Sequence, residues 1–137
     1  MGLVNTEITL KNVEDGAYAR AGIIKPEEIR TATVTAIADT GAMSLVITEE
    51  MRQKLGLGVI GEKTALVANG QRVTGFVTDA VEVQWKNRFT ILPALVIPGA
   101  EKILMGAIVL EGMDLMVNPV TQEVVGAHGD REEWLVL

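Results

Sequence analysis

Apolar and polar residues alternate along much of this chain, which is the two-residue period of a half-buried β-strand. The alternation is clearest at 81–85, where polar residues separate Val81, Val83 and Trp85. A second strand signal is the run T-A-T-V-T-A-I-A at 31–38, which is rich in β-branched residues. These signals predict strands at 4–10, 31–38, 44–47, 64–68, 71–77, 81–85 and 89–97, the last of them interrupted by Pro93.

Helical signals are fewer than strand signals. Thr48 is placed to cap a helix over 49–55, because acids fill the first turn, basic residues fill the last, and Gly56 follows. The segment K-P-E-E at 25–28 predicts a turn or one short helical turn, since proline suits the first helical position. The apolar run 103–110 is expected to begin as a strand and to end as a short helix.

Turn residues predict two hairpins. The dipeptide Asn69-Gly70 lies between two of the predicted strands and is a strong short-range hairpin signal. The dipeptide Asn118-Pro119 separates two short apolar runs, 115–117 and 123–125. We expect these two runs to pair as a final hairpin.

The order of these segments is faintly repeated within the chain. The first half contains a strand, the sequence D-T-G-A, a second strand and a helix. The second half contains a strand at 94–97, another strand, the sequence L-M-G-A and a short helix. In each half an apolar strand ends near a glycine that lets the backbone turn sharply. This repetition favours a small β-barrel built from two similar halves.

Length and composition define the general class of protein. The chain has 137 residues, of which 48% are hydrophobic and 22% are charged, and these values suit one globular domain with a buried core. We expect a single domain over 1–137, with its core at about 4–125 and a tail at 126–137.

Charge and cysteine content exclude several functions. The formal net charge is −6 and the basic residues are scattered singly, so nucleic acid is not an expected partner. No apolar run approaches the roughly 18 residues of a membrane span, and no membrane contact is expected. Cysteine is absent, which excludes disulfides and thiolate metal sites and suits the reducing cytoplasm, our expected location. We expect no metal and no other cofactor.

One acidic residue stands out because it directly follows an apolar strand. The sequence A-D-T-G-A at 38–42 places Asp39 at this point, and a buried carboxylate is costly unless it is paired or hydrogen-bonded. One interpretation is a turn in which Asp39 caps its own backbone and Gly41 supplies a positive φ. The hairpin signal downstream and the later L-M-G at 104–106 favour a functional interpretation.

These segments together resemble the retropepsin-like aspartic proteases, in particular small stand-alone forms from bacteria and archaea. The resemblance rests on D-T-G-A at 39–42, the Asn69-Gly70 hairpin, I-L-M-G at 103–106 and the closing L-M-V-N-P at 115–119, and it covers about 4–125. It implies a closed, mostly antiparallel β-barrel with one or two short helices. It also implies a homodimer with the active site on the two-fold axis.

The resemblance implies an aspartic endopeptidase that hydrolyses extended polypeptide. In this chemistry two carboxylates share a proton: one activates a water as general base, and the protonated one polarises the scissile carbonyl. Asp39 would supply one carboxylate from each chain, because no other aspartate lies in such a motif. Thr40 would hydrogen-bond the partner's loop, Gly41 would offer its N–H and C=O to the substrate, and Ala42 would leave room for the peptide.

Two further segments receive roles from the resemblance. The hairpin 64–77 would be a flap that closes over the peptide and excludes water, and peptide pairing there would resemble strand addition. The substrate-binding residues at its tip would be Ala68, Asn69, Gly70 and Gln71. The residues that support the 39–42 loop from behind would be Leu104, Met105 and Gly106.

Departures from the family pattern keep other functions open. Met43-Ser44 stand where retroviral relatives carry acids, and Ala107 stands where they carry a basic or polar residue. The same dimeric fold could therefore serve as a peptide-binding or scaffolding module with little turnover. A third alternative is an unrelated β-barrel in which D-T-G is only a turn.

The remaining chemically distinctive residues are explained without a site. His128 has no serine, cysteine or second metal-type ligand motif beside it, and it is interpreted as a plain surface histidine. Trp85 and Trp134 are expected to fill the core or an interface, because each lies in or beside an apolar segment.

Overall fold

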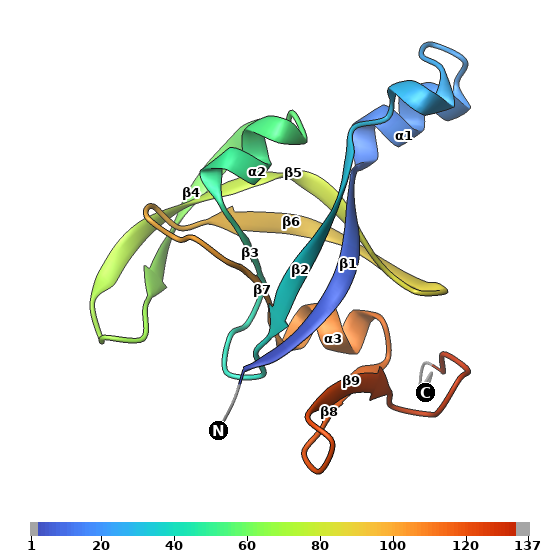
Figure 1. Cartoon of the computed structure of the whole chain (residues 1–137). Coiled ribbons are helices and arrows are strands. Elements are labelled where there is room, and N and C mark those ends of the chain that lie inside the picture. The colour runs from blue at the N-terminus through green and yellow to red at the C-terminus, as the bar shows by residue number, and fades with distance from the viewer. Residues whose placement is uncertain (1–2, 134–137) are drawn as a thin grey trace, which may run out of the picture.

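The computed structural model describes residues 3–133 and is mostly β-structure (Figure 1). Its strands are β1 (Val4–Asn12), β2 (Thr31–Ala38), β3 (Leu45–Ile47), β4 (Val59–Leu66), β5 (Arg72–Trp85), β6 (Arg88–Val96), β7 (Ile103–Met105), β8 (Leu115–Asn118) and β9 (Glu123–Gly126). Its helices are α1 (Val13–Arg20), α2 (Glu49–Lys54) and α3 (Ala107–Gly112), and a 3-10 turn spans Pro26–Glu28. Within residues 3–133, none of these helices has the length and apolar content needed to cross a bilayer.

Most of the strands form a closed barrel. They pair in the order β1-β2-β7-β3-β6-β5-β4, and an additional antiparallel pairing of β1 with β5 closes a ring of six strands. Strand β4 lies outside that ring, where it pairs with β5. Strands β8 and β9 form a separate two-stranded sheet, which lies beside α3 at the lower end of the barrel in Figure 1. The predicted β-barrel with few short helices is therefore confirmed.

The two halves of the chain interlock at the centre of this sheet. Strand β2 runs parallel to β7, and β3 runs parallel to β6. The inner pair, β3 and β7, is antiparallel. In the order β2-β7-β3-β6, the outer strand β2 of the first half therefore corresponds to β6 of the second, and the inner strand β3 corresponds to β7. Each inner strand leads to a helix, α2 or α3. This pairing agrees with the repetition in the sequence.

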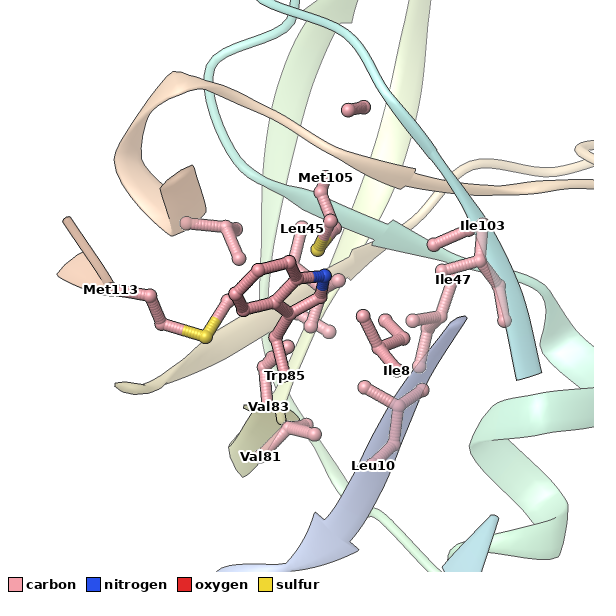
Figure 2. Close-up of a cluster of buried hydrophobic side chains, with 14 of the residues drawn as sticks. Ile8, Leu10, Leu45, Ile47, Val81, Val83, Trp85, Ile103, Met105 and Met113 are labelled. Atoms are coloured by element: carbon pink, nitrogen blue, oxygen red, sulfur yellow. The ribbon is translucent and has the colours of Figure 1, made fainter. Parts of the chain in front are cut away.

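The barrel is filled by aliphatic side chains from nearly every strand (Figure 2). Leu10, Leu45, Val83 and Met105 are fully buried, and each such side chain contributes about 1.5–3 kcal/mol of hydrophobic free energy. Trp85 lies in the same cluster and keeps its polar atom satisfied by donating from Nε1 to the Thr6 hydroxyl at 2.9 Å. The prediction that Trp85 fills the core is confirmed.

Strand β5 differs from its prediction because it is continuous. The segments expected at 71–77 and 81–85 form one strand of 14 residues, with a shift of register against β6 between Val77 and Ala80. Pro93 pairs with Ala80 and does not interrupt β6. A proline has no N–H for a regular ladder, so it is tolerated where the pairing is already irregular.

Helix α1 was not predicted from the sequence. It contains Gly16 and has no apolar stripe, so its local helix signal is weak. Asn12 caps the helix locally by accepting from the Asp15 amide. A more distant residue also holds it, because Asp15 forms a bidentate pair with Arg30 at 2.8 and 2.9 Å. The Arg30 guanidinium also lowers the pKa of the buried Asp15 carboxyl.

Candidate active site

Asp39 lies where β2 ends and the loop to β3 begins. Its N–H donates to the carbonyl of Met105 at 2.9 Å, which continues the β2–β7 pairing by one residue. The Ala42 N–H donates back to the Asp39 carbonyl at 3.1 Å and closes the turn. Asp39 is half-buried, and Thr40 and Gly41 are exposed. The loop lies at the lower end of the barrel in Figure 1, at the same end as α3.

The carboxylate of Asp39 has one hydrogen-bond partner among the described residues. The Gly41 N–H donates to its Oδ1 at 2.9 Å. The turn interpretation is correct that Asp39 caps its own backbone, but it is wrong about φ, because Gly41 is not among the residues with positive φ. The glycine instead leaves space, since a Cβ at this position would lie 3.2 Å from Oδ1. The remaining lone pairs of the carboxylate are available to other groups.

The N-terminus of α3 holds the loop in place. The first N–H groups of a helix have no partner inside the helix. In α3 the Ala107 N–H donates to the Ala42 carbonyl at 2.8 Å, and the Ile108 N–H donates to the Met43 carbonyl at 3.0 Å. The backbone after Asp39 is therefore bonded to a helix that begins more than sixty residues later in the chain.

Gly106 is the point of closest approach between α3 and the loop. Its N–H donates to the Ser44 carbonyl at 2.9 Å. A Cβ at Gly106 would lie 2.5 Å from the Met43 carbonyl carbon and 2.6 Å from the Ala42 carbonyl oxygen. Its φ of −82° is ordinary, so the position requires glycine for space and not for backbone conformation.

The two motifs of the sequence are thus neighbours in the structure. Leu104 pairs with Ile37 in β2 and with Val46 in β3, and Met105 is fully buried. The segment 104–106 therefore lies between the two strands that carry the Asp39 loop. This arrangement fixes the backbone of the loop while leaving the acidic side chain accessible.

The predicted hairpin forms at the far end of β4 and β5. The Val67 N–H donates to the Gln71 carbonyl at 3.0 Å, and the Gly70 N–H donates to the Val67 carbonyl at 2.9 Å. Gly70 has a φ of +85° and Asn69 has no positive φ, so the loop is a three-residue turn that ends in a left-handed glycine. The four predicted tip residues, Ala68 to Gln71, are all exposed.

A second cluster of charged groups lies at the other end of α3. The predicted surface histidine, His128, is half-exposed, but its Nδ1 lies 2.8 Å from Oδ2 of Asp114. The hydrogen bond from the Glu133 N–H is the largest cause that lowers the pKa of Asp114, and the hydrogen bond with His128 is the next. In turn, Asp114 raises the pKa of His128. Asp114 has a φ of +53°. No local sequence signal links these residues, because the contact is made only by the folded tail.

A buried arginine completes this cluster, hereafter the Asp114 cluster (Arg88, Asp114, His128 and the Glu133 amide). The Arg88 side chain is 2% exposed and donates to the carbonyls of Asp114 and Gly129, both at 2.6 Å. It therefore attaches the segment after β9 to the barrel. The predictions for Trp134 and for the rest of 134–137 lie outside the described residues.

The described part of the chain offers no obvious metal site. Within residues 3–133, no three His, Cys, Asp or Glu side chains gather in a way that could hold an ion. The predicted site residues therefore fall into two groups: the loop 39–42 with its support 104–106, and the separate hairpin tip 68–71.

The comparison with protein families gives a match over both groups. The model of the family described as "Aspartyl protease" matches residues 26–123. Those residues include the Asp39 loop, the hairpin tip and the segment 104–106. No curated protein sequence matches the chain significantly.

The comparison with solved structures gives the fold. The chain is similar to EIAV protease complexed with the inhibitor HBY-793, with 19% identity, a TM-score of 0.58, and coverage of 80% of this chain and 86% of that one. It is also similar to a retropepsin-like aspartic protease from Rickettsia conorii, with 24% identity, a TM-score of 0.47, and coverage of 64% and 76%. With the family match over residues 26–123, which is more than half of its length, the chain belongs to the aspartyl protease family and has a retropepsin-like barrel.

Proposed function

We propose that the protein is a homodimeric aspartic endopeptidase in which Asp39 of each chain supplies one catalytic carboxylate. The observation that carries this proposal is the contrast within the Asp39 loop. Its backbone is bonded to β7 and α3, while its carboxylate accepts one hydrogen bond, from the Gly41 N–H. A rigid loop that presents an accessible carboxylate is what this reaction requires.

The reaction needs two carboxylates, and one chain does not offer a second one of the same kind. Activation of water and polarisation of the scissile carbonyl are divided between an ionised and a protonated carboxyl group. Three of the four other aspartates already have partners at 2.8 Å within their own chain: Asp15 with Arg30, Asp79 with the Gly58 amide, and Asp114 with His128. The fourth, Asp130, is exposed and outside any such motif. A second copy of Asp39 therefore completes the site.

Exposed apolar side chains support a dimer at this end of the barrel. Met43 of the loop is 73% exposed, and Ile108 of α3 is 48% exposed. Leu3, Met116 and Val120 are also exposed, at 64%, 42% and 89%. Leu3 directly precedes β1, Met116 belongs to β8 and Val120 to the turn after it, and Figure 1 shows the start of β1 and the β8–β9 hairpin at the same end as α3. Large exposed apolar side chains gathered on one side favour a protein interface.

The other predicted residues have consistent roles in this proposal. Thr40 bonds the partner's loop across the two-fold axis, Gly41 presents its backbone to the substrate, and Ala42 leaves space for the peptide. The flap, residues 64–77, closes over an extended polypeptide with Ala68 to Gln71 at its tip. Leu104, Met105 and Gly106 hold the loop from behind. The reaction needs no metal or cofactor, and we keep the cytoplasm as the expected location because the chain has no cysteine.

The substitution Asp39→Asn tests the proposal. We expect at least about a hundredfold loss of cleavage of an unfolded protein substrate, because the general acid–base pair is lost. The variant should still dimerise in sedimentation experiments. The matched control is Asp130→Asn, which removes an exposed carboxylate elsewhere and should leave the rate unchanged.

Three outcomes would contradict the proposal. Cleavage that persists in Asp39→Asn would remove Asp39 from the reaction. A wild-type protein that binds peptide without cleaving it, and binds equally well after the substitution, would identify a peptide-binding module. A chain that stays monomeric with and without peptide would leave the site without its second carboxylate.

A further inference from the structure

Strand β5 changes direction between the barrel wall and the flap. Its pairing with β6 shifts register between Val77 and Ala80, so Thr78 and Asp79 form a bulge. A bulge bends the strand and locally increases its twist. Residues before the bulge pair with β4 and form the flap, although Phe76 and Val77 also still pair with β6; residues after the bulge pair with β1 and β6. Thr78 and Asp79 therefore lie at the base of the flap.

Thr78 attaches this base to the barrel. Its side chain is fully buried. The hydroxyl accepts a hydrogen bond from the Ala94 N–H of β6 at 3.1 Å and donates to the Asp79 carbonyl at 2.7 Å. The Thr78 hydroxyl thus gives hydrogen-bond partners to the Ala94 N–H and the Asp79 carbonyl at the point where the bulge interrupts the ladder.

Asp79 attaches the same base to the beginning of β4. Its Oδ2 accepts from the Gly58 N–H at 2.8 Å, and its own N–H donates to the Gly58 carbonyl at 2.9 Å. Asp79 therefore binds both backbone polar groups of Gly58, the residue just before β4. The register of β4 also shifts here, between Val59 and Gly61, so both strands of the flap are irregular at this level.

Beyond this level the flap has few other supports. Among the described residues, β4 pairs with β5 and with no other strand. Gly75 still packs against Leu95, where a Cβ would lie 2.8 Å from a methyl carbon. From there to the tip, the ladder consists of β4 and β5 alone. The orientation of the flap is therefore set mainly by contacts at its base.

We propose that Asp79 is a positioning residue that sets the resting orientation of the flap through Gly58. It does not touch the reacting atoms. Its carboxylate holds the beginning of β4 against the bulge in β5, so the two flap strands move as one unit about Thr78, which stays with the barrel. The importance of this contact for substrate binding rests on the proposed peptidase function, but the contact itself can be tested without any substrate.

Hydrogen exchange of the β4 amides tests the contact directly. In Asp79→Ala we expect exchange at 59–66 to accelerate about tenfold, because the charge-assisted hydrogen bond to Gly58 is lost. Asp79→Asn should restore most of the protection, since an amide oxygen can accept the same N–H. The matched control is Glu82→Ala on the same strand, whose carboxylate lies 4.0 Å from Lys11 and does not touch β4. Unchanged exchange in Asp79→Ala would overturn the proposal.

A double-mutant cycle with Gly58 makes the test specific. The φ of Gly58 is not positive, so alanine is not strained there, but its Cβ would lie 2.9 Å from Oδ2 of Asp79. We expect Gly58→Ala to displace the carboxylate and to accelerate β4 exchange to the level of Asp79→Ala. In the Asp79→Ala background the same change should add nothing, because the obstructing oxygen is absent. Additive effects of the two substitutions would overturn the proposal.

Kinetics then separate this inference from the proposed function. If the protein is a peptidase, Asp79→Ala should raise KM several-fold and leave kcat within about threefold, because a loosened flap weakens binding of substrate and transition state alike. Wild-type protein without peptidase activity, but with the predicted exchange pattern, would contradict the function and leave the role of Asp79 intact. A protein that cleaves peptide but shows unchanged exchange in Asp79→Ala would support the function and contradict the role of Asp79.

Discussion

The two ends of α3 each lie beside an aspartate, and the two carboxylates are treated in opposite ways. At the N-terminal end, the backbone of Asp39 is hydrogen-bonded to Met105 and Ala42, and its carboxylate accepts one hydrogen bond within residues 3–133, from the Gly41 amide. At the C-terminal end, Asp114 is 9% exposed and is bonded to the His128 ring and the Glu133 amide, with Arg88 at 3.9 Å. The Asp114 carboxylate is used by contacts within the fold, whereas the Asp39 carboxylate is mostly unused by the described residues. The two carboxylates therefore differ both in burial and in the number of hydrogen bonds that they accept within the chain.

The strongest way to break this comparison is to remove the arginine from the Asp114 cluster. Arg88→Ala should lower the free energy of unfolding by about 3–5 kcal/mol, because it leaves the carbonyls of Met113, Asp114 and Gly129 without their donor and empties a large buried space. Denaturant titration measures the change. The exposed Arg131 provides the control, and Arg131→Ala should have little effect. A loss below about 1 kcal/mol in Arg88→Ala would show that the cluster does not hold the fold.

The next largest effect concerns the support of the Asp39 loop. Gly106→Ala would place a Cβ 2.5–2.6 Å from backbone atoms of Met43, Ala42 and Ser44, so we expect destabilisation of about 1–3 kcal/mol. Peptidase activity should fall further than stability explains, because the loop must shift. Gly61→Ala is the matched control, since no atom lies within 4 Å of the added carbon. Equal effects of the two substitutions would contradict the tight approach at Gly106.

The Asp114 cluster should also be sensitive to pH. Asp114 contributes stability above its ordinary pKa of 3.8, and this contribution is lost as the pH falls through its lowered folded value. His128 contributes fully below its ordinary pKa of 6.5, and this contribution is lost as the pH rises through its raised folded value. The Tm difference between wild type and His128→Gln should therefore be largest between the ordinary pKa values of the two groups, pH 3.8 and pH 6.5, and it should decrease at alkaline pH. A difference that is constant with pH would contradict the ion pair.

The smallest expected effect on stability is that of removing the Asp39 carboxylate. Asp39→Asn should change the free energy of unfolding of the chain by no more than about 0.5 kcal/mol, because its carboxylate makes a single exposed hydrogen bond. Asp114→Asn, measured in the same titration, should be clearly more destabilising. A large loss in Asp39→Asn would show that this carboxylate, too, has a structural role.

Local signals in the sequence predict those parts of the fold that depend on neighbouring residues. The β-branched run at 31–38 is the whole of β2, and the cap at Thr48 forms as expected by accepting from the Met51 amide. The Asn69-Gly70 hairpin also forms, although its turn has three residues because Asn69 keeps a negative φ. In each case the information lies within a few residues along the chain.

Features that depend on distant partners could not be predicted in this way. Helix α1 is stabilised by Arg30, which follows it by ten residues, and Asp114 meets Arg88 and the tail only in the folded chain. For the candidate site, the sequence motifs indicated which segments matter. The bonds between α3 and the loop, and between Asp79 and Gly58, join segments that are far apart in the chain, so no local pattern indicates them.

The interlocked order β2-β7-β3-β6 has a consequence for the timing of assembly. Asp39 is synthesised before the backbone groups that hold its loop, because these groups belong to β7 and α3, more than sixty residues later in the chain. Neither half can complete the barrel alone, because β7 lies between β2 and β3, and β3 lies between β7 and β6. The Asp39 loop of a nascent chain therefore lacks its supports until β7 and α3 have been made, so most of the barrel must be synthesised before this loop is ordered.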